Sequence, residues 1–152
     1  MDGNELKAFI FSASRATYAS GDESIKKKQS DGSTTIEYIE GNLKFHDNYF
    51  GGEPYGGREV IFRDEKAVWM MVYYGLVHAE IGNAQVYGFL TEALRNTTPE
   101  APYRGPAVYE KLDWKYENTL TGDVDHFSGI EKIYHEGVCV YEASYIGGLV
   151  DC

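Results

Sequence analysis

Hydrophobic positions along the chain follow a helical period twice and a strand period several times. Apolar residues three or four apart follow Asn4 and end near Gly21, which predicts an amphipathic helix capped by Asn4. A second helix is predicted to open at Asn83 and to stop at the segment 97–106, which carries three prolines. Alternating or short apolar runs predict seven strands, over 34–39, 43–50, 59–63, 66–75, 112–120, 126–135 and 138–146.

Short turns between these runs indicate antiparallel hairpins. The segment 51–57 contains four glycines and is predicted to be irregular. The run 66–75 is apolar on both faces, which favours a central position in the sheet. The order helix, four strands, helix, three strands (α-ββββ-α-βββ) predicts an α+β fold, with an antiparallel sheet and both helices packed on one face.

The second half of the chain repeats the strand pattern of the first half with an offset of 72 residues. Laying 57–75 over 129–147 gives six identities in 19 positions, where about one is expected by chance. This predicts two related helix-plus-meander halves, at about 4–78 and 79–148, that join around a pseudo-twofold axis. The sheet face away from the helices is then expected to form a trough, where a ligand can bind between the halves.

Length and charge narrow the classes of function. The 152 residues fit one domain, 1–152, large enough for a hydrophobic core. A net charge of −10 repels phosphate backbones and disfavours direct binding of nucleic acid. No apolar run approaches the ~18 residues of a membrane span, and the N-terminus does not have a signal-peptide layout. We therefore expect a cytoplasmic protein without a membrane partner.

Candidate binding residues come from the two hairpins related by the offset. Turns at 64–65 and 136–137 place Glu59 opposite Met70 and Glu131 opposite Glu142. Directly opposed carboxylates destabilise a sheet unless solvent screens them or a cation or a shared proton bridges them. The prediction is an acidic spot in the trough, and the competing interpretation is a screened pair that faces solvent.

Aromatic residues near these carboxylates favour a cationic or flat ligand. We predict ligand binding by five residues: Glu59, Glu131, Glu142, Trp69 and Tyr74. The same register puts four aromatic residues on the opposite sheet face, where ordinary core packing is the competing interpretation; these are Trp69, Tyr73, Tyr141 and Tyr145.

Known catalytic and metal-binding motifs are not present. The sequence contains no GxSxG elbow, HExxH helix, CxxC pair or phosphate-cradling glycine loop, so neither a metal site nor a cofactor is predicted. An alternative is a hydrolase or metal-assisted enzyme that uses His46, Asp123, Asp125 or His126. Neighbouring residues in a strand point to opposite faces, however, and solvated turns explain the 123–126 run equally well.

A family resemblance rests on several short stretches spread over nearly the whole chain. They are Ala16-Thr17-Tyr18-Ala19, Tyr49-Phe50-Gly51-Gly52, Val68-Trp69, Tyr73-Tyr74-Gly75 and Pro102-Tyr103-Arg104-Gly105-Pro106. With these the chain resembles a prokaryotic domain-of-unknown-function family that also occurs fused behind helix-turn-helix regulators. The resemblance implies a sensing or regulatory role and assigns no catalytic residue. This chain starts almost directly at the first helix, so a regulatory role here requires a separate protein partner.

Three hypotheses of function remain open. The first is a non-enzymatic domain that binds or senses a small molecule, in loose analogy to the duplicated effector-binding domains of multidrug regulators. The second is the enzyme described above. The third is a protein-interaction domain without a pocket, which a flat aromatic surface patch and a specific homodimer would support.

Overall fold

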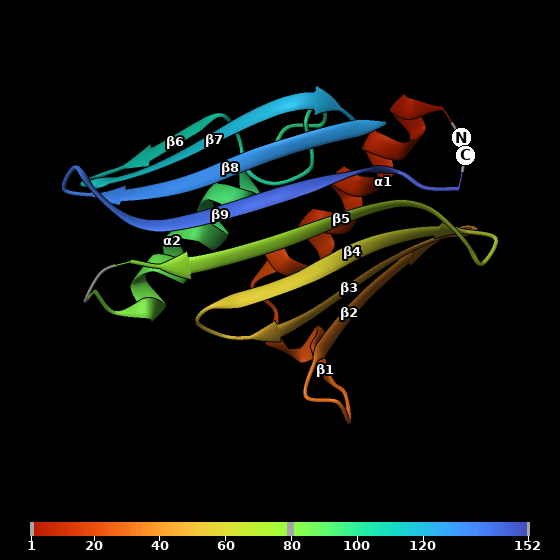
Figure 1. The fold of residues 1–152 in the computed structure, drawn as a ribbon, viewed down its shortest axis with the longest axis horizontal. Helices are drawn as coiled ribbons and strands as arrows, with labels where there is room; N and C mark the ends of the chain where they lie inside the picture. Colours follow the sequence, from red (N-terminus) through yellow and green to blue (C-terminus); the bar gives the residue numbers. More distant parts are fainter. Residues whose placement is uncertain (1, 79–80, 152) are drawn as a thin grey trace.

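Two α-helices and one continuous antiparallel sheet make up the fold in the computed structural model, which describes residues 2–78 and 81–151 (Figure 1). The elements in chain order are α1 (Gly3–Ala16), the short 3-10 helices η1 (Tyr18–Ser20) and η2 (Glu23–Ile25), β1 (Lys27–Lys28), β2 (Thr34–Glu40), β3 (Leu43–Gly51), β4 (Tyr55–Arg63), β5 (Lys66–Val77), α2 (Asn83–Arg95), β6 (Val108–Lys111), β7 (Trp114–Asp123), β8 (His126–His135) and β9 (Val138–Leu149).

The nine strands lie in the order β1-β2-β3-β4-β5-β9-β8-β7-β6. Strands β5 and β9 meet in the middle of the sheet, and at the centre of their pairing Tyr73 lies opposite Tyr145. Both helices lie behind the sheet in Figure 1, so the viewer looks onto a face that no helix covers. We call this surface the open face, and the other one the helix face.

The two helices bury the apolar positions that the helical period predicts. In α1 these include Leu6, Phe9 and Ile10. The residues of α2 that are buried include Phe89 and Leu90. The cap of α1 differs from the prediction, because Asp2 is the N-cap and its carboxylate accepts the backbone N–H of Asn4 at 3.3 Å. Helix α2 opens at Asn83 and ends at Arg95, close to the predicted limits.

Two hydrophobic clusters fill the space between the helices and the sheet. The first joins α1 to side chains of β3, β4 and β5, and it includes the stacked rings of Trp69 and Phe127. The second joins α2 to side chains of β7, β8 and β9, such as Ile133 and Tyr141. Burial of this apolar surface supplies the main stabilisation of the fold, at roughly 25 cal/mol per Å².

The predicted α+β class and the antiparallel sheet are confirmed, but the strand count was wrong. The sheet has nine strands rather than seven, because the short edge strands β1 and β6 were not predicted. Leu112 adopts a φ of 53° and lies in the turn between β6 and β7, so β7 begins at Trp114 rather than at the predicted residue 112. The segment 51–57, which was predicted to be irregular, contains the first residues of β4, because that strand begins at Tyr55.

Glycine suits this start of β4 because a bulky neighbour occupies the space of its missing side chain. A Cβ atom on Gly57 would lie 2.7 Å from the Tyr73 hydroxyl oxygen.

None of the helices in residues 2–78 and 81–151 has the length and apolar character needed to cross a membrane.

Candidate functional site

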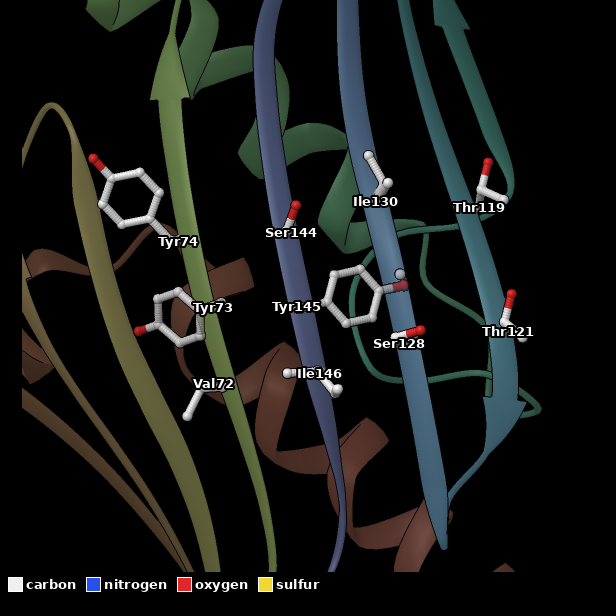
Figure 2. A pocket seen from close by; sticks show the side chains of 11 residues that line it. Val72, Tyr73, Tyr74, Thr119, Thr121, Ser128, Ile130, Ser144, Tyr145 and Ile146 are labelled. Atoms are coloured by element: carbon white, nitrogen blue, oxygen red, sulfur yellow. The ribbon is translucent and has the colours of Figure 1, made fainter.

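A hollow of about 500 Å³ lies on the open face, over the middle of the sheet. Side chains from four neighbouring strands, β5, β9, β8 and β7, line it, as Figure 2 shows. The lining residues are Val72, Tyr73, Tyr74, Thr119, Thr121, Ser128, Gly129, Ile130, Ser144, Tyr145 and Ile146. Its volume lies within the range of about 300–1,000 Å³ that is usual for small-molecule sites.

Strand alternation brings these side chains to the open face. Successive side chains of a strand point to opposite faces, so Tyr74 is 55% exposed while its neighbour Tyr73 is buried. In β8 the same alternation leaves Ile130 46% exposed and buries Glu131. The exposed apolar side chains of Val72, Ile130 and Ile146 thus come from three adjacent strands. They form an apolar surface that solvent reaches.

The chemistry of the hollow is apolar and uncharged. None of its lining residues carries a formal charge. Ser144 lies between the strands that carry Tyr74 and Ile130, and the hydroxyls of Ser128, Thr119 and Thr121 lie toward one side (Figure 2). Such a surface offers van der Waals contact and ring stacking, together with hydroxyl groups that can donate or accept hydrogen bonds.

Two buried tyrosines connect the hollow to the helix face. The Tyr73 hydroxyl donates to Asp47 Oδ1 at 2.6 Å, and the Tyr145 hydroxyl donates to Asn118 Oδ1 at 2.7 Å. Burial is the main reason why the pKa of Tyr145 is raised to about 12. Both phenols therefore remain neutral donors at physiological pH, and their rings are fixed on the helix face, behind the strands that carry the hollow.

A group of buried charges lies on the helix face of the sheet, on β3, β4 and β8 and in the segment after α2, and we call it the buried acid cluster. It consists of Asp47, Glu59, Glu131 and Arg104, each of which is at most 5% exposed. Arg104 comes from the segment between α2 and β6, and its Nε donates to Glu131 Oε1. The Tyr116 hydroxyl donates to Glu131 Oε2 at 2.8 Å, so Glu131 is paired on both oxygens.

The other two carboxylates of the cluster face each other across β3 and β4. Asp47 pairs with Glu59 in the strand register, and neither oxygen of Glu59 has a hydrogen-bond partner in the described part of the chain. Burial raises the pKa of Asp47 to about 6, against the opposing effects of its hydrogen bond from Tyr73 and of Arg104. Burial, followed by repulsion from Asp47, raises the pKa of Glu59 well above its usual value.

The predicted register of the two hairpins was wrong by one residue. Glu59 lies opposite Met71 rather than Met70, and Glu131 lies opposite Ala143 rather than Glu142. The cause is a β-bulge in each hairpin, which adds one residue on the strand after the turn and reverses the faces beyond it. Glu142 is therefore a half-exposed residue whose partner is Lys132, at 3.8 Å between Oε2 and Nζ.

The corrected register moves Glu59 and Glu131 to the face of the predicted aromatic set, and the core packing expected for Trp69, Tyr73, Tyr141 and Tyr145 is confirmed. Trp69 and Tyr73 share the helix face with Glu59 instead of lying opposite to it. Trp69 is fully buried, stacks on Phe127 and donates from Nε1 to the Val124 carbonyl at 3.1 Å. It therefore packs in the core and does not line the hollow. Of the five predicted binding residues, Tyr74 is the one that the structure places in the hollow.

The residues of the enzyme hypothesis do not form a common site in the structure. His46 is half-buried, and burial lowers the pKa of its imidazole. Asp123 accepts the Lys7 ammonium at 2.6 Å, and Asp125 accepts the backbone N–H of His126 at 3.0 Å. Within residues 2–78 and 81–151, no group of three His, Cys, Asp or Glu side chains is placed to hold a metal ion.

Asp47 and Arg104 were missed as members of a buried cluster. Asp47 carried a usable signal, because it occupies an inward position of β3 that is two residues from the buried Phe45. Arg104 lies between Pro102 and Pro106 in a segment without regular periodicity. Its position under β8 depends on tertiary structure, which local sequence patterns do not encode.

Comparison with known proteins identifies a family. A family model described as "Domain of unknown function (DUF5680)" matches residues 47–150, which is more than half of the chain and includes all four residues of the buried acid cluster. No curated protein and no solved structure matches the chain.

Proposed function

The chain belongs to the DUF5680 family, and from its geometry we propose that it is a non-enzymatic domain that binds a small molecule in the hollow of the open face. The observation that carries this proposal is the hollow itself. It is a concave, apolar surface with a volume of about 500 Å³ over the central strands, and the side chain of Tyr74, which is 55% exposed, lies at it.

The ligand class that fits this surface is a flat molecule without net charge. A charged group would lose its hydration without meeting an opposite charge, because the lining residues carry none. A flat ring can stack on Tyr74 and contact Val72, Ile130 and Ile146. Its polar edge can reach the hydroxyl groups of residues such as Ser144. Of the two predicted kinds of ligand, the hollow therefore suits a flat aromatic molecule better than a cationic one.

We further infer that the two halves of the sheet arose by duplication and that the hollow lies where they meet. The offset of 72 residues relates Tyr73 to Tyr145, and these two residues are direct partners in the β5–β9 register. The same offset relates Glu59 to Glu131 and both bulged hairpins to each other. The lining strands belong to one continuous sheet, which holds their side chains in place. Less conformational entropy is therefore lost when a ligand binds.

A polar substitution within the hollow tests the proposal. Ile130→Asn places an amide in the apolar surface, and we expect it to weaken binding of the neutral fluorescent dye Nile red about tenfold or more. Ile39→Asn is the matched control, because Ile39 is 66% exposed on β2 and does not line the hollow. Fluorescence titration gives the two dissociation constants.

Two results of this titration would count against the proposal. The first is equal weakening by both substitutions, since it would show that the dye binds general apolar surface. The second is a wild-type chain that does not bind the dye and instead forms a dimer that Ile130→Asn dissociates. That result would favour the protein-interaction alternative, which the exposed Val72, Tyr74 and Ile146 on the same face support.

A further inference from the structure

Arg58 lies beside the hollow, on the strand that borders β5. It is exposed on β4 and is the register partner of Val72, which lines the hollow and is itself the partner of Ile146. Direct partners on antiparallel strands have their side chains on the same face, with Cβ atoms about 4.5–5.5 Å apart. The next residue, Glu59, is buried on the helix face, so strand alternation also places Arg58 on the open face. Arg58 therefore borders the hollow at its β4 side.

Tyr74 extends the aromatic surface of the hollow toward the same strand. A Cβ atom on Gly56, the register partner of Tyr74, would lie 3.0 Å from Cδ2 of the Tyr74 ring. The ring is thus inclined toward β4, as Figure 2 shows, and Gly56 leaves room for it. Arg58 is the next open-face residue along β4 and a diagonal neighbour of Tyr74, and long side chains span such a separation. A ligand ring on Tyr74 therefore lies within reach of the guanidinium.

The side chain of Arg58 has no partner among the described residues. The chain contains five arginines, and in the structure four of them donate to a carbonyl or pair with a carboxylate; these are Arg15, Arg63, Arg95 and Arg104. On the β3 side, the register partner of Arg58 is Asn48, which is neutral. A guanidinium carries five N–H donors in a flat fork. These donors are therefore available to a ligand in the hollow.

The charges of the molecule favour a neutral acceptor for these donors. The net charge of −10 repels an anionic ligand, and the guanidinium of Arg58 repels a cationic one. A carbonyl oxygen on a flat ring accepts hydrogen bonds near the plane of the ring, so the ring can still stack on Tyr74 and contact Val72. Hydrogen bonds from a charged donor are also stronger than those from a neutral one.

We propose that Arg58 determines the specificity of the hollow, by selecting flat ring compounds that carry a neutral carbonyl oxygen at the edge facing β4. This inference rests on the proposed function, because it requires a ring bound over Tyr74 and Val72. The guanidinium donates to the carbonyl oxygen of the bound ligand. A hydrocarbon of the same shape offers no acceptor, so it gains only the apolar contacts.

A pair of compounds with the same shape tests this role. 2-Acetylnaphthalene and 2-ethylnaphthalene differ by a carbonyl group in place of a methylene group, and displacement of bound Nile red measures the affinity of each. We expect the wild type to bind the ketone about fivefold more tightly than the hydrocarbon. Arg58→Met keeps an apolar stem and removes the guanidinium. The ratio should then fall to about one or below, because the carbonyl loses hydration without meeting a donor.

Arg63→Met is the matched control, since it removes a positive charge from the same strand. Arg63 pairs with Glu5 and does not line the hollow, so the preference for the ketone should remain about fivefold. Arg58 is exposed and its side chain has no partner in the described residues, so Arg58→Met is expected to fold as the wild type does.

The outcomes separate this inference from the proposed function. An unchanged ratio in Arg58→Met, with both compounds still bound, would overturn the role of Arg58 and leave the hollow as a binding site. A fall in the ratio that Arg63→Met reproduces would overturn it as well, because the cause would be net charge. A wild-type chain that binds neither compound and no Nile red would overturn both proposals.

Discussion

The pair Asp47 and Asn118 shows how a single atom changes the properties of a buried position. Both side chains accept a tyrosine hydroxyl, with oxygen–oxygen distances of 2.6 Å and 2.7 Å. Both also lie beside a buried glutamate in the neighbouring strand. Asn118 is neutral, whereas Asp47 carries a charge above its raised pKa of about 6. The first half of the sheet therefore holds a charge that the hydrogen bond itself does not require.

Asp47→Asn is expected to stabilise the protein above pH 6 by on the order of 3 kcal/mol. The folded-state pKa of Asp47 is about 6 and its ordinary value is 3.8, so the folded state binds the proton more tightly. In the wild type, the contribution of protonated Asp47 to stability is therefore complete below pH 3.8 and is lost as the pH rises through about 6. The asparagine variant lacks this loss and keeps an acceptor for Tyr73.

Urea unfolding at pH 4, 5, 6, 7 and 8 measures this effect. The difference in unfolding free energy between Asp47→Asn and wild type should grow from pH 4 to pH 7 and then level off. Asp123→Asn serves as the control, because Asp123 is 62% exposed and pairs with Lys7 at the surface. A difference for Asp47→Asn that does not change with pH would contradict a buried carboxylate with a raised pKa.

At the scale of the elements, the sequence predicts what depends on local periodicity. Both helices and the hairpins were found because apolar residues such as Phe9 and Leu90 repeat at helical spacing and strand residues alternate. The short edge strands β1 and β6 were missed, since two and four residues are too few to show an alternating pattern. A bulge also leaves no local signal, so Glu59 and Trp69 were assigned to opposite faces, although they share one.

The candidate site was predictable to a similar degree. Tyr74 was placed in the trough because strand alternation brings it to the open face. The partners of Glu131 come from β7 and from the segment after α2, so no pattern within the β8–β9 hairpin indicates Tyr116 or Arg104. Contacts between residues that are distant in the chain depend on the register of several strands at once, and a one-residue error changes every face.

Strand β8 contains one position where packing requires glycine. A Cβ atom on Gly129 would overlap the ring of Tyr145, whose hydroxyl is held by Asn118. Gly129→Ala is therefore expected to lower the unfolding free energy by about 1–3 kcal/mol, as overpacking of a core does. Gly52→Ala is the control, because a Cβ there meets no atom within 4 Å. Urea denaturation of both variants measures the difference, and equal stabilities would show that the Tyr145 ring is free to move.

At the scale of the whole molecule, one sheet carries two kinds of surface on its opposite faces. The helix face of the sheet holds the core and the buried acid cluster, while the open face holds the uncharged hollow. The central pair of β5 and β9 belongs to both, because Tyr73 and Tyr145 line the hollow and donate to Asp47 and Asn118 below it. A ligand in the hollow would therefore lie on the central strands, whose tyrosines are held by hydrogen bonds on the other face.

Amide chemical-shift mapping shows whether the hollow binds a small molecule. A ligand selected by a thermal-shift screen of flat neutral compounds is titrated into labelled protein, since any ligand of the native state raises its melting temperature. We expect the largest shifts on residues 72–74, 128–130 and 144–146, which line the hollow. Shifts confined to α1, α2 or the edge strands β1 and β6, with the central strands unchanged, would contradict it.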